Sequence, residues 1–313
     1  FFRYASEFGF QSFPSVKTLE TVTDDPKELN PFSYVMEKHQ RNYGGNGKIA
    51  KYMQAAYRYP ENFSDFVYAS QLLQADGIRY GVEHYRRNRG RCMGAIYWQL
   101  NDCWPVISWS SIDYYGRWKA LHYYAKRFFA PVMLSCEEQS WMTVEADMNR
   151  QHFEFEKSIR LNVTNETLDA HRVLVKWAVR KTDATILREE EQWLEVPALS
   201  AVWMDKVELP QIDCFNEYVS YEAWENDQII SQGTVIFSYP KYFHYLNPGL
   251  AVRVDGDEIV VKAEAYAKSV EIRNENDDLI LEDNYFDMNA GEYRVKILDG
   301  KPDGLKVRSV YDI

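Results

Sequence analysis

The hydrophobic pattern changes its period once, at Ala130-Pro131, and this change most constrains the fold of the chain. Before it, short apolar runs alternate with longer segments of helical spacing, which is typical of parallel βα units. After it, short segments alternate apolar and polar positions between turn residues, which is typical of antiparallel β-sandwiches. A chain of 313 residues is long enough for two or three domains. The sequence therefore predicts an α/β part followed by an all-β part.

The α/β part is expected to run strand, helix, strand, helix. Residues 1–10, FFRYASEFGF, and 91–101, RCMGAIYWQLN, have the aromatic and apolar content of short buried strands. A helix is expected after Asn62 or Ser64, either of which can cap it, and another at about residues 116–129. The face of the first helix is predicted to comprise Phe63, Phe66, Val67, Ser70, Leu73, Gly77, Tyr80 and His84.

The all-β part is expected to form two sandwiches of immunoglobulin-like size. Turns are expected at Asn149–Gln151, at Thr182–Ala184 and in a hairpin at Asp255-Gly256. The acidic run Glu189–Glu191 suits a solvated turn or a strand edge. The predicted strands before the last block lie at residues 152–165, 171–181, 201–209, 217–226 and 228–238. The predicted domains are 1–131, 132–239 and 240–313.

Charge and composition exclude several classes of partner. The net charge of −11 and the pI of about 5.2 argue against nucleic acid, because phosphate binding needs clustered Lys and Arg. No apolar run approaches the length of a membrane helix. The four cysteines lack metal-ligand spacing, so we expect free thiols and neither a metal nor an organic cofactor.

Glu7 is an acid within an aromatic run that is expected to be buried. An unpaired buried carboxylate costs several kcal/mol or gives up its charge. The sequence therefore indicates that Glu7 is paired from outside the run or serves a chemical purpose. Arg3, four residues earlier, shares its face in a regular strand and is a candidate support.

Residues 97–118 combine aromatic and polar side chains in an unusual density. Four Trp and three Tyr alternate there with Asn101, Asp102, Ser110 and Asp113. Aromatic faces edged by Asn and Asp suit a polyhydroxylated ligand, whose C–H faces stack while its hydroxyls hydrogen-bond. Packing and capping at a βα corner is the alternative.

If both strands belong to one parallel barrel, Glu7 and Trp98 share the cleft at the strand ends. A retaining glycosidase needs two carboxyl groups about 5 Å apart, and Glu7 can be one of them.

Two stretches, SEFGFQSFPS at 6–15 and the run from WQLND to FFAPV at 98–132, resemble the β-mannosidases of glycoside hydrolase family 2. The resemblance implies the last two βα units of a (β/α)8 TIM barrel followed by two immunoglobulin-like β-sandwiches. It implies that Glu7 is the catalytic nucleophile and that Trp98 lines the sugar pocket. Asn101, Asp102 and Trp104 are implied as further members of the pocket wall.

The implied function is that of a retaining exo-β-glycosidase, which releases terminal non-reducing β-D-mannose through a covalent glycosyl-enzyme intermediate. The family's acid/base is a Glu in an Asn-Glu motif of an earlier barrel strand, whereas here Asn-Glu occurs only at 165, 216 and 274. The family's N-terminal domains and six further barrel strands are not in this chain. We therefore expect a C-terminal portion of such an enzyme, inactive by itself and partnered by the N-terminal portion.

Other assignments stay open. A second family 2 activity, that of an exo-β-glucosaminidase, β-galactosidase or β-glucuronidase, shares the fold and nucleophile, and a non-catalytic carbohydrate-binding module is a further alternative. His39 is either a surface-loop residue or part of the pocket rim. Trp193 and Trp224 are either core residues or sugar-binding residues. Acidic composition and few cysteines suit a cytoplasmic protein, while the sequons at Asn62, Asn162 and Asn165 leave a lysosomal or secreted one open.

Overall fold

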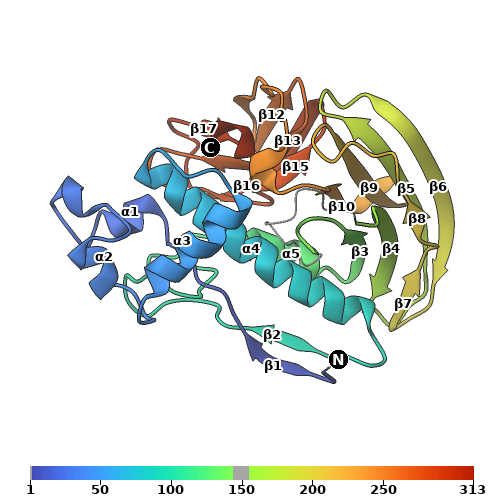
Figure 1. The fold of residues 1–313 in the computed structure, drawn as a ribbon, viewed down its shortest axis with the longest axis horizontal. Helices are drawn as coiled ribbons and strands as arrows, with labels where there is room; N and C mark the ends of the chain where they lie inside the picture. Colours follow the sequence, from blue (N-terminus) through green and yellow to red (C-terminus); the bar gives the residue numbers. More distant parts are fainter. Residues whose placement is uncertain (1, 144–154) are drawn as a thin grey trace. The chain divides into compact units, whose positions relative to one another are not determined.

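The computed structural model describes residues 2–143 and 155–313 (Figure 1). The chain forms two compact units, each assembled from segments that are distant in sequence. The first unit comprises Phe1–Ala5, Gly81–Ala95 and Arg127–Leu246, and the second comprises Ser6–Tyr80, Ile96–Lys126 and Asn247–Ile313. The three-domain division stays a prediction, and the turn expected at Asn149–Gln151 lies outside the described residues.

The first unit contains an antiparallel β-sandwich. One sheet has the order β3-β4-β7, with β8 also paired to β4, and the other has the order β10-β9-β5-β6. The strands are β3 (Val132–Gln139), β4 (Ser158–Asn165), β5 (His171–Lys181), β6 (Ile186–Val196), β7 (Ser200–Trp203), β8 (Val207–Glu208), β9 (Glu217–Glu225) and β10 (Gln228–Ile236). The prediction of β5 is confirmed at both ends, and a turn follows at Thr182 as expected. The sequence did not predict β3 or β6.

Strand β6 explains the acidic run at Glu189–Glu191. It pairs only with β5 among the described strands and lies at the edge of its sheet, as Figure 1 shows. Nearly all of its side chains are exposed, so the alternation that marks a half-buried strand is absent. The strand-edge interpretation of the run is therefore confirmed, and charges there discourage pairing with another chain.

The core of this sandwich comes from alternate positions of facing strands. Val173, Val175 and Trp177 of β5 are buried, while Leu174 and Lys176 between them point to the opposite face of the sheet. Each fully buried Val contributes about 1.5–3 kcal/mol to folding. The prediction of an immunoglobulin-like sandwich here rests on this alternation, and the fold confirms it.

The two sequons of β4 lie inside the sandwich. Asn165 is fully buried, and its Nδ2 donates to the carbonyl oxygens of Asp169, Val196 and Pro197. Asn162 is also fully buried. In the folded chain these amides are therefore structural, and a glycan cannot be accommodated on either without local unfolding.

The C-terminal segment of the second unit is a smaller all-β module. Its strands form one sheet in the order β11-β12-β16-β14 and another in the order β15-β13-β17. The strands are β11 (Ala251–Asp255), β12 (Glu258–Ala263), β13 (Ala267–Arg273), β14 (Ile280–Leu281), β15 (Phe286–Met288), β16 (Gly291–Asp299) and β17 (Lys306–Arg308). The predicted hairpin is confirmed: Asp255 pairs with Glu258, and Gly256 has a φ of 67° that favours glycine.

The predicted α/β part contains two short strands, β1 (Ala5–Phe8) and β2 (Ala95–Tyr97), which pair with each other. The pairing advances in the same direction along both strands, because Met93 N donates to Arg3 O and Trp98 N donates to Phe8 O. This is the parallel arrangement that the βα pattern predicts. Both strands are shorter than expected.

The prediction that these strands are buried is wrong. Ser6 and Glu7 are exposed, and Ile96 of β2 is 51% exposed. A two-stranded sheet has no further strands to cover its faces, whereas the aromatic composition of the runs suits a larger sheet. Glu7 is therefore in contact with solvent in this chain.

The helices are α1 (Val16–Leu19), α2 (Tyr34–Lys38), α3 (Gly45–Ala56), α4 (Phe63–Arg87) and α5 (Ala120–Phe128), with 3-10 turns η1 (Pro26–Glu28), η2 (Pro240–Tyr242) and η3 (Val310–Asp312). The prediction of α4 is confirmed, including its cap, since Asn62 Oδ1 accepts from Asp65 N at 2.9 Å. Its buried face differs from the predicted one: Leu73 is half-buried and Gly77 exposed, whereas Gln71 and Gln74 are buried. None of the helices that the structure describes is long and apolar enough to cross a membrane.

Candidate active site

The ends of β1 and β2 bring the predicted site residues together in the second unit. Trp98 N donates to Phe8 O at 2.7 Å, so Trp98 lies beside the residue that follows Glu7. Both side chains are accessible, Trp98 being 46% exposed. The expectation that the two strand ends are neighbours is therefore confirmed, while the roles of Glu7 and Trp98 stay predictions. Arg3 lies ahead of β1, outside this unit, and its supporting role also stays a prediction.

Gly9 allows the close approach of the chain at this point. A Cβ atom on Gly9 would lie 2.5 Å from Trp98 O and 2.9 Å from Trp109 Cδ1. Contacts that short require the backbone to move, because the nearest atom belongs to the main chain. The glycine after the strand is therefore needed to seat Trp98 and Trp109 against the end of β1.

Asp102 organises the loop that follows Trp98. It is only 6% exposed, and its carboxylate oxygens accept from Ser108 Oγ at 2.6 Å and from Ser110 Oγ at 2.5 Å. Two charge-assisted hydrogen bonds of this length hold the loop closed. The geometry of Asp102 favours shaping the pocket wall, and a direct contact with sugar stays a prediction.

Asn101 and Trp104 lie on the same loop with more exposure. Asn101 is exposed, and its Nδ2 donates to Asp102 O at 3.3 Å. Trp104 is half-buried, and its ring lies 5.1 Å from the imidazole of His39 between centroids. His39 Nδ1 donates to Pro105 O at 2.6 Å, and the second ring nitrogen, Nε2, takes no part in this bond. His39 is thus an immediate neighbour of Trp104, as the pocket-rim interpretation requires, although its contact with a ligand stays a prediction.

Helix α4 anchors both strand ends through buried amides that sequence reasoning missed. Gln74 Nε2 donates to Phe10 O at 2.8 Å and to Trp109 O at 3.0 Å, while Gln74 Oε1 accepts from Ser12 Oγ at 2.6 Å. One side chain therefore joins the segment after β1 to the loop after β2. The signal in the sequence is the pair of polar residues Ser70 and Gln74, four positions apart on a helix face that also carries Val67 and Ile78.

Two further charged residues lie buried behind the loop. Lys119 is fully buried, and its Nζ donates to Ser12 O at 3.3 Å. Burial lowers the pKa of Lys119 to about 8, against the opposing attraction of Asp102 and Asp113. Burial also raises the pKa of Asp113, whose Oδ1 accepts from Tyr115 N and Arg117 N. Asp113 therefore holds the turn at residues 113–117 through its side chain.

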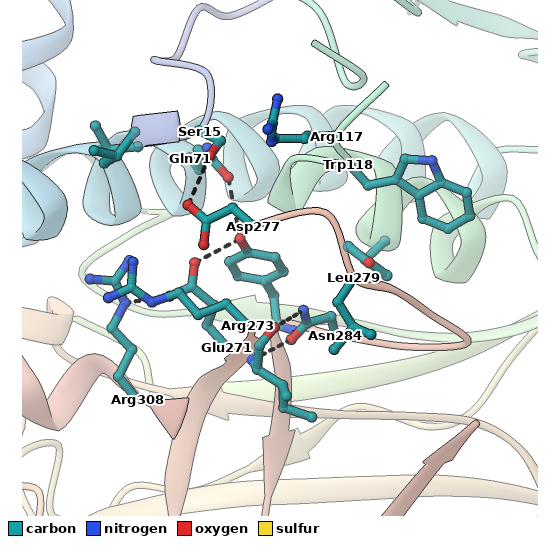
Figure 2. A pocket seen from close by; sticks show the side chains of 15 residues that line it. Ser15, Gln71, Arg117, Trp118, Glu271, Arg273, Asp277, Leu279, Asn284 and Arg308 are labelled. Atoms are coloured by element: carbon teal, nitrogen blue, oxygen red, sulfur yellow. Dashed lines mark hydrogen bonds and ion pairs between the residues drawn. The ribbon is translucent and has the colours of Figure 1, made fainter. Parts of the chain in front are cut away.

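A separate cavity of about 50 Å³ lies elsewhere in the second unit (Figure 2). Glu271 pairs there with Arg308 and accepts from Tyr285 Oη at 2.8 Å, while Asp277 accepts from Ser15 Oγ at 2.9 Å. This volume holds a few waters and is far below that of a ligand pocket. The cavity is therefore not the predicted sugar site. Within the described residues, no group of three or more His, Cys, Asp or Glu side chains is arranged to hold a metal ion.

Two protein-family models match the all-β part of the chain. The mannosidase Ig/CBM-like domain matches residues 157–242, and the Ig-fold domain of mannosidases matches residues 245–313. β-Mannosidase B of Thermothelomyces thermophilus is 30% identical over 99% of this chain and 39% of its own length. β-Mannosidase of Capra hircus is 39% identical over 42% of this chain and 16% of its own length. The chain therefore spans about two-fifths of the length of the first of these relatives.

Solved structures also match this chain. The crystal structure of β-D-mannosidase from Dictyoglomus thermophilum has a TM-score of 0.83 and 25% identity, over 98% of this chain and 37% of that one. The exo-chitosanase of Amycolatopsis orientalis has a TM-score of 0.68 at 16% identity, over 98% of this chain and 42% of that one, which shows the shared fold alone.

These matches place the chain with the glycoside hydrolases of family 2. Within that class the chain is a homologue of the β-mannosidases and corresponds to their C-terminal portion. The resemblance drawn from the residues around Glu7 and Trp98 is thereby confirmed, as are the two immunoglobulin-like domains.

Gly9→Ala is expected to destabilise the strand-end region by about 1–3 kcal/mol, because the new Cβ overpacks against Trp98 O. Urea denaturation followed by tryptophan fluorescence measures this loss. The matched control is Gly47→Ala in α3, where a Cβ meets nothing within 4 Å and alanine raises helix propensity by up to about 1 kcal/mol. Equal stability of Gly9→Ala and the wild type would contradict the close approach.

Lys119 is expected to make stability depend on pH between about 8 and 10.5. Its pKa in the folded chain, about 8, lies below its ordinary value of 10.5, so the unfolded chain binds this proton more tightly. The contribution of Lys119 is least favourable below pH 8 and improves as the pH rises to 10.5. The free energy of unfolding of the wild type minus that of Lys119→Met should rise by about 3 kcal/mol over this window. Exposed Lys48→Met is the control, and urea denaturation at several pH values measures both; a flat difference for Lys119→Met would contradict the prediction.

Proposed function

We propose that this chain is part of a retaining β-mannosidase that removes terminal non-reducing β-D-mannose from glycosides and oligosaccharides. Residues 1–131 then correspond to the last two βα units of a (β/α)8 barrel, with the two immunoglobulin-like domains behind them. The observation that carries the proposal is the side-by-side parallel pairing of β1 and β2, with Glu7 and Trp98 at their adjacent ends. Identity of 30% to a β-mannosidase along 99% of the chain supports the substrate class.

In this proposal Glu7 is the nucleophile. Its carboxylate attacks C1 of the mannoside, the bond from C1 to the leaving oxygen breaks, and a covalent mannosyl-enzyme forms. The acid/base protonates the leaving oxygen and then deprotonates a water, which releases mannose with retained configuration. The exposure of Glu7 at the strand end suits a residue that reaches a bound sugar.

The Trp98 ring provides an apolar face for the sugar at the same strand end. Asn101 and Trp104 extend the wall, and Asp102 holds their loop in place through Ser108 and Ser110. His39 packs against Trp104 with the two rings tilted to each other, and it extends the rim toward the leaving group. The binding energy for the sugar comes in this way from a loop that buried hydrogen bonds keep rigid.

The acid/base belongs to another part of the enzyme. Of the three Asn-Glu pairs in this chain, Glu166 forms ion pairs with Arg89 and Arg86, and Glu217 accepts from Asp213 N at 3.0 Å. All three pairs lie in the all-β part, away from β1 and β2 in sequence. The chain's partner is therefore the remaining portion of the same enzyme, and its cytoplasmic location stays a prediction.

A β-glucosaminidase activity is supported less well. The exo-chitosanase structure shares the fold at 16% identity, whereas identities of 30% and 39% are to β-mannosidases. A non-catalytic carbohydrate-binding role is the second candidate, favoured by the Ig/CBM-like match over residues 157–242. Covalent labelling of Glu7 distinguishes the proposed hydrolase from a non-catalytic binding module.

Glu7 is expected to carry the covalent adduct when the complete enzyme is treated with a 2-deoxy-2-fluoro-mannosyl fluoride. Peptide mapping by mass spectrometry locates the adduct. Glu7→Gln in the complete enzyme should lower kcat/KM for an aryl β-mannoside at least about a thousandfold, because an amide cannot replace the nucleophile. Glu20→Gln, an exposed acid paired with Lys17, should leave kcat/KM within about twofold. An adduct on another residue would overturn the assignment.

The chain of 313 residues by itself is expected to show no appreciable hydrolysis of an aryl β-mannoside, because the acid/base is supplied from outside it. Release of the aryl alcohol, followed by absorbance, measures the rate, and the complete enzyme is the positive control. Turnover by the purified chain that disappears in Glu7→Gln would show that the second carboxylate lies within residues 1–313.

A further inference from the structure

The outer face of the sheet β10-β9-β5-β6 carries a row of large, partly exposed apolar side chains. Leu174 of β5 pairs with Trp193 of β6 on one side and with Trp224 of β9 on the other. Residues opposite each other in register project to the same face, so the three side chains form a row across the sheet. Trp193 is 53% exposed and Trp224 is half-buried. The two tryptophans are two strand spacings apart, about 10 Å.

A groove of about 460 Å³ adjoins this row on the same face. Two residues after Leu174 on β5, Lys176 lies between Glu191 of β6 and Glu222 of β9. Two residues further along β5, Ala178 lies between Glu189 and Ser220. The side chains along the groove thus alternate with those that point into the sandwich core. The groove is lined by Lys176, Trp177, Ala178, Arg180, Glu189, Glu190, Glu191, Ser220 and Glu222.

The charges around the tryptophans are paired with each other. Lys176 Nζ lies 3.4 Å from Glu191 Oε2, and Arg172 Nε lies 3.4 Å from Glu195 Oε1. The face therefore presents both signs in close succession, which suits a neutral ligand better than a polyanion. Mixed carboxylates and cations offer acceptors and donors to hydroxyl groups.

The rings are held in defined orientations. Trp224 Nε1 donates to Glu222 Oε2 at 2.8 Å, and Lys176 Nζ lies 5.4 Å from the Trp224 ring centroid. Arg172 Cζ lies 4.6 Å from the Trp193 ring centroid. Both cationic side chains are well exposed, so they can move aside from the rings and hydrogen-bond to a ligand.

We propose that this face is a second carbohydrate-binding site, which takes a neutral, extended, β-linked oligosaccharide. Sugar rings stack on Trp193 and Trp224 and span Leu174, while hydroxyls bond to Lys176, Glu191 and Glu222 in the adjoining groove. The site holds this extended chain of sugars and is separate from Glu7, which acts on a terminal sugar. It therefore goes beyond the proposed hydrolysis, because it assigns a binding role to the immunoglobulin-like domain itself.

Isothermal titration calorimetry of the full 313-residue chain with β-1,4-mannohexaose tests the site. The wild type is expected to bind with a Kd in the millimolar range, and Trp193→Ala and Trp224→Ala should each weaken binding at least about fivefold. Trp193→Tyr retains a ring and should retain most of the affinity. Trp203→Ala is the matched control: Trp203 is half-buried in β7 of the other sheet, and Arg160 Cζ lies 4.7 Å from its ring centroid. Near-UV circular dichroism and thermal unfolding confirm that each variant is folded.

Three results would overturn the proposal. One is absence of wild-type binding up to ~10 mM sugar. Another is an equal loss of affinity in Trp203→Ala. The third is a change of oligomeric state in Trp193→Ala or Trp224→Ala, by sedimentation velocity, without a change in sugar affinity, which would make this face a contact between copies of the chain.

Glu7→Gln distinguishes this site from the proposed active site. Failure of covalent labelling at Glu7 would overturn the proposed hydrolysis and leave the mannohexaose titrations of Trp193→Ala and Trp224→Ala unaffected. Loss of mannohexaose binding in Glu7→Gln, with Trp193→Ala unchanged, would place the bound sugar at the ends of β1 and β2 and overturn the second site.

Discussion

The arrangement of the candidate active site depends on the buried side chain of Gln74. It is fully buried in α4, and it bonds to Phe10 O, Trp109 O and Ser12 Oγ, which belong to the two segments that leave β1 and β2. Two strands alone do not form an independently stable sheet. Leaving these part-buried carbonyls without donors would cost at most about 1–3 kcal/mol each. The positions of Glu7 and Trp98 therefore depend on a helix residue that lies between the two strands in sequence and touches neither side chain in the described contacts.

Behind this junction, charge is buried to keep loops in place. Lys119, Asp102 and Asp113 are all nearly inaccessible, and each bonds to a backbone or hydroxyl group of a neighbouring segment. Burial of such groups is costly unless hydrogen bonds and opposite charges offset it. The all-β domains use the same principle differently, since Asn165 satisfies three carbonyl oxygens inside a sandwich of Val, Ile and Leu. The buried charges near the candidate active site keep the loops rigid around exposed aromatic rings. In the sandwich, Asn165 closes the end of strand β4.

The sequence predicted the elements whose signal is local. Strand β5, the hairpin at Gly256 and helix α4 with its Asn62 cap all follow from residue pattern alone. The neighbourhood of Glu7 and Trp98 followed from the expectation of parallel strands. Burial was mispredicted where it depends on neighbours: β1 and β2 have core-like composition but no covering strands, and Gln71 and Gln74 read as polar although they are buried. Strand β6 was missed because an edge strand with exposed acids shows no alternation.

The pairing of β1 and β2 leaves each strand with one outer edge that no other described strand occupies. Such an edge presents backbone N–H and C=O groups at regular spacing, and these groups favour the addition of another strand. The same geometry that exposes Glu7 thus makes this part of the chain receptive to strands made on a separate polypeptide. In the family 2 barrel proposed for residues 1–131, these two edges are where neighbouring barrel strands would pair.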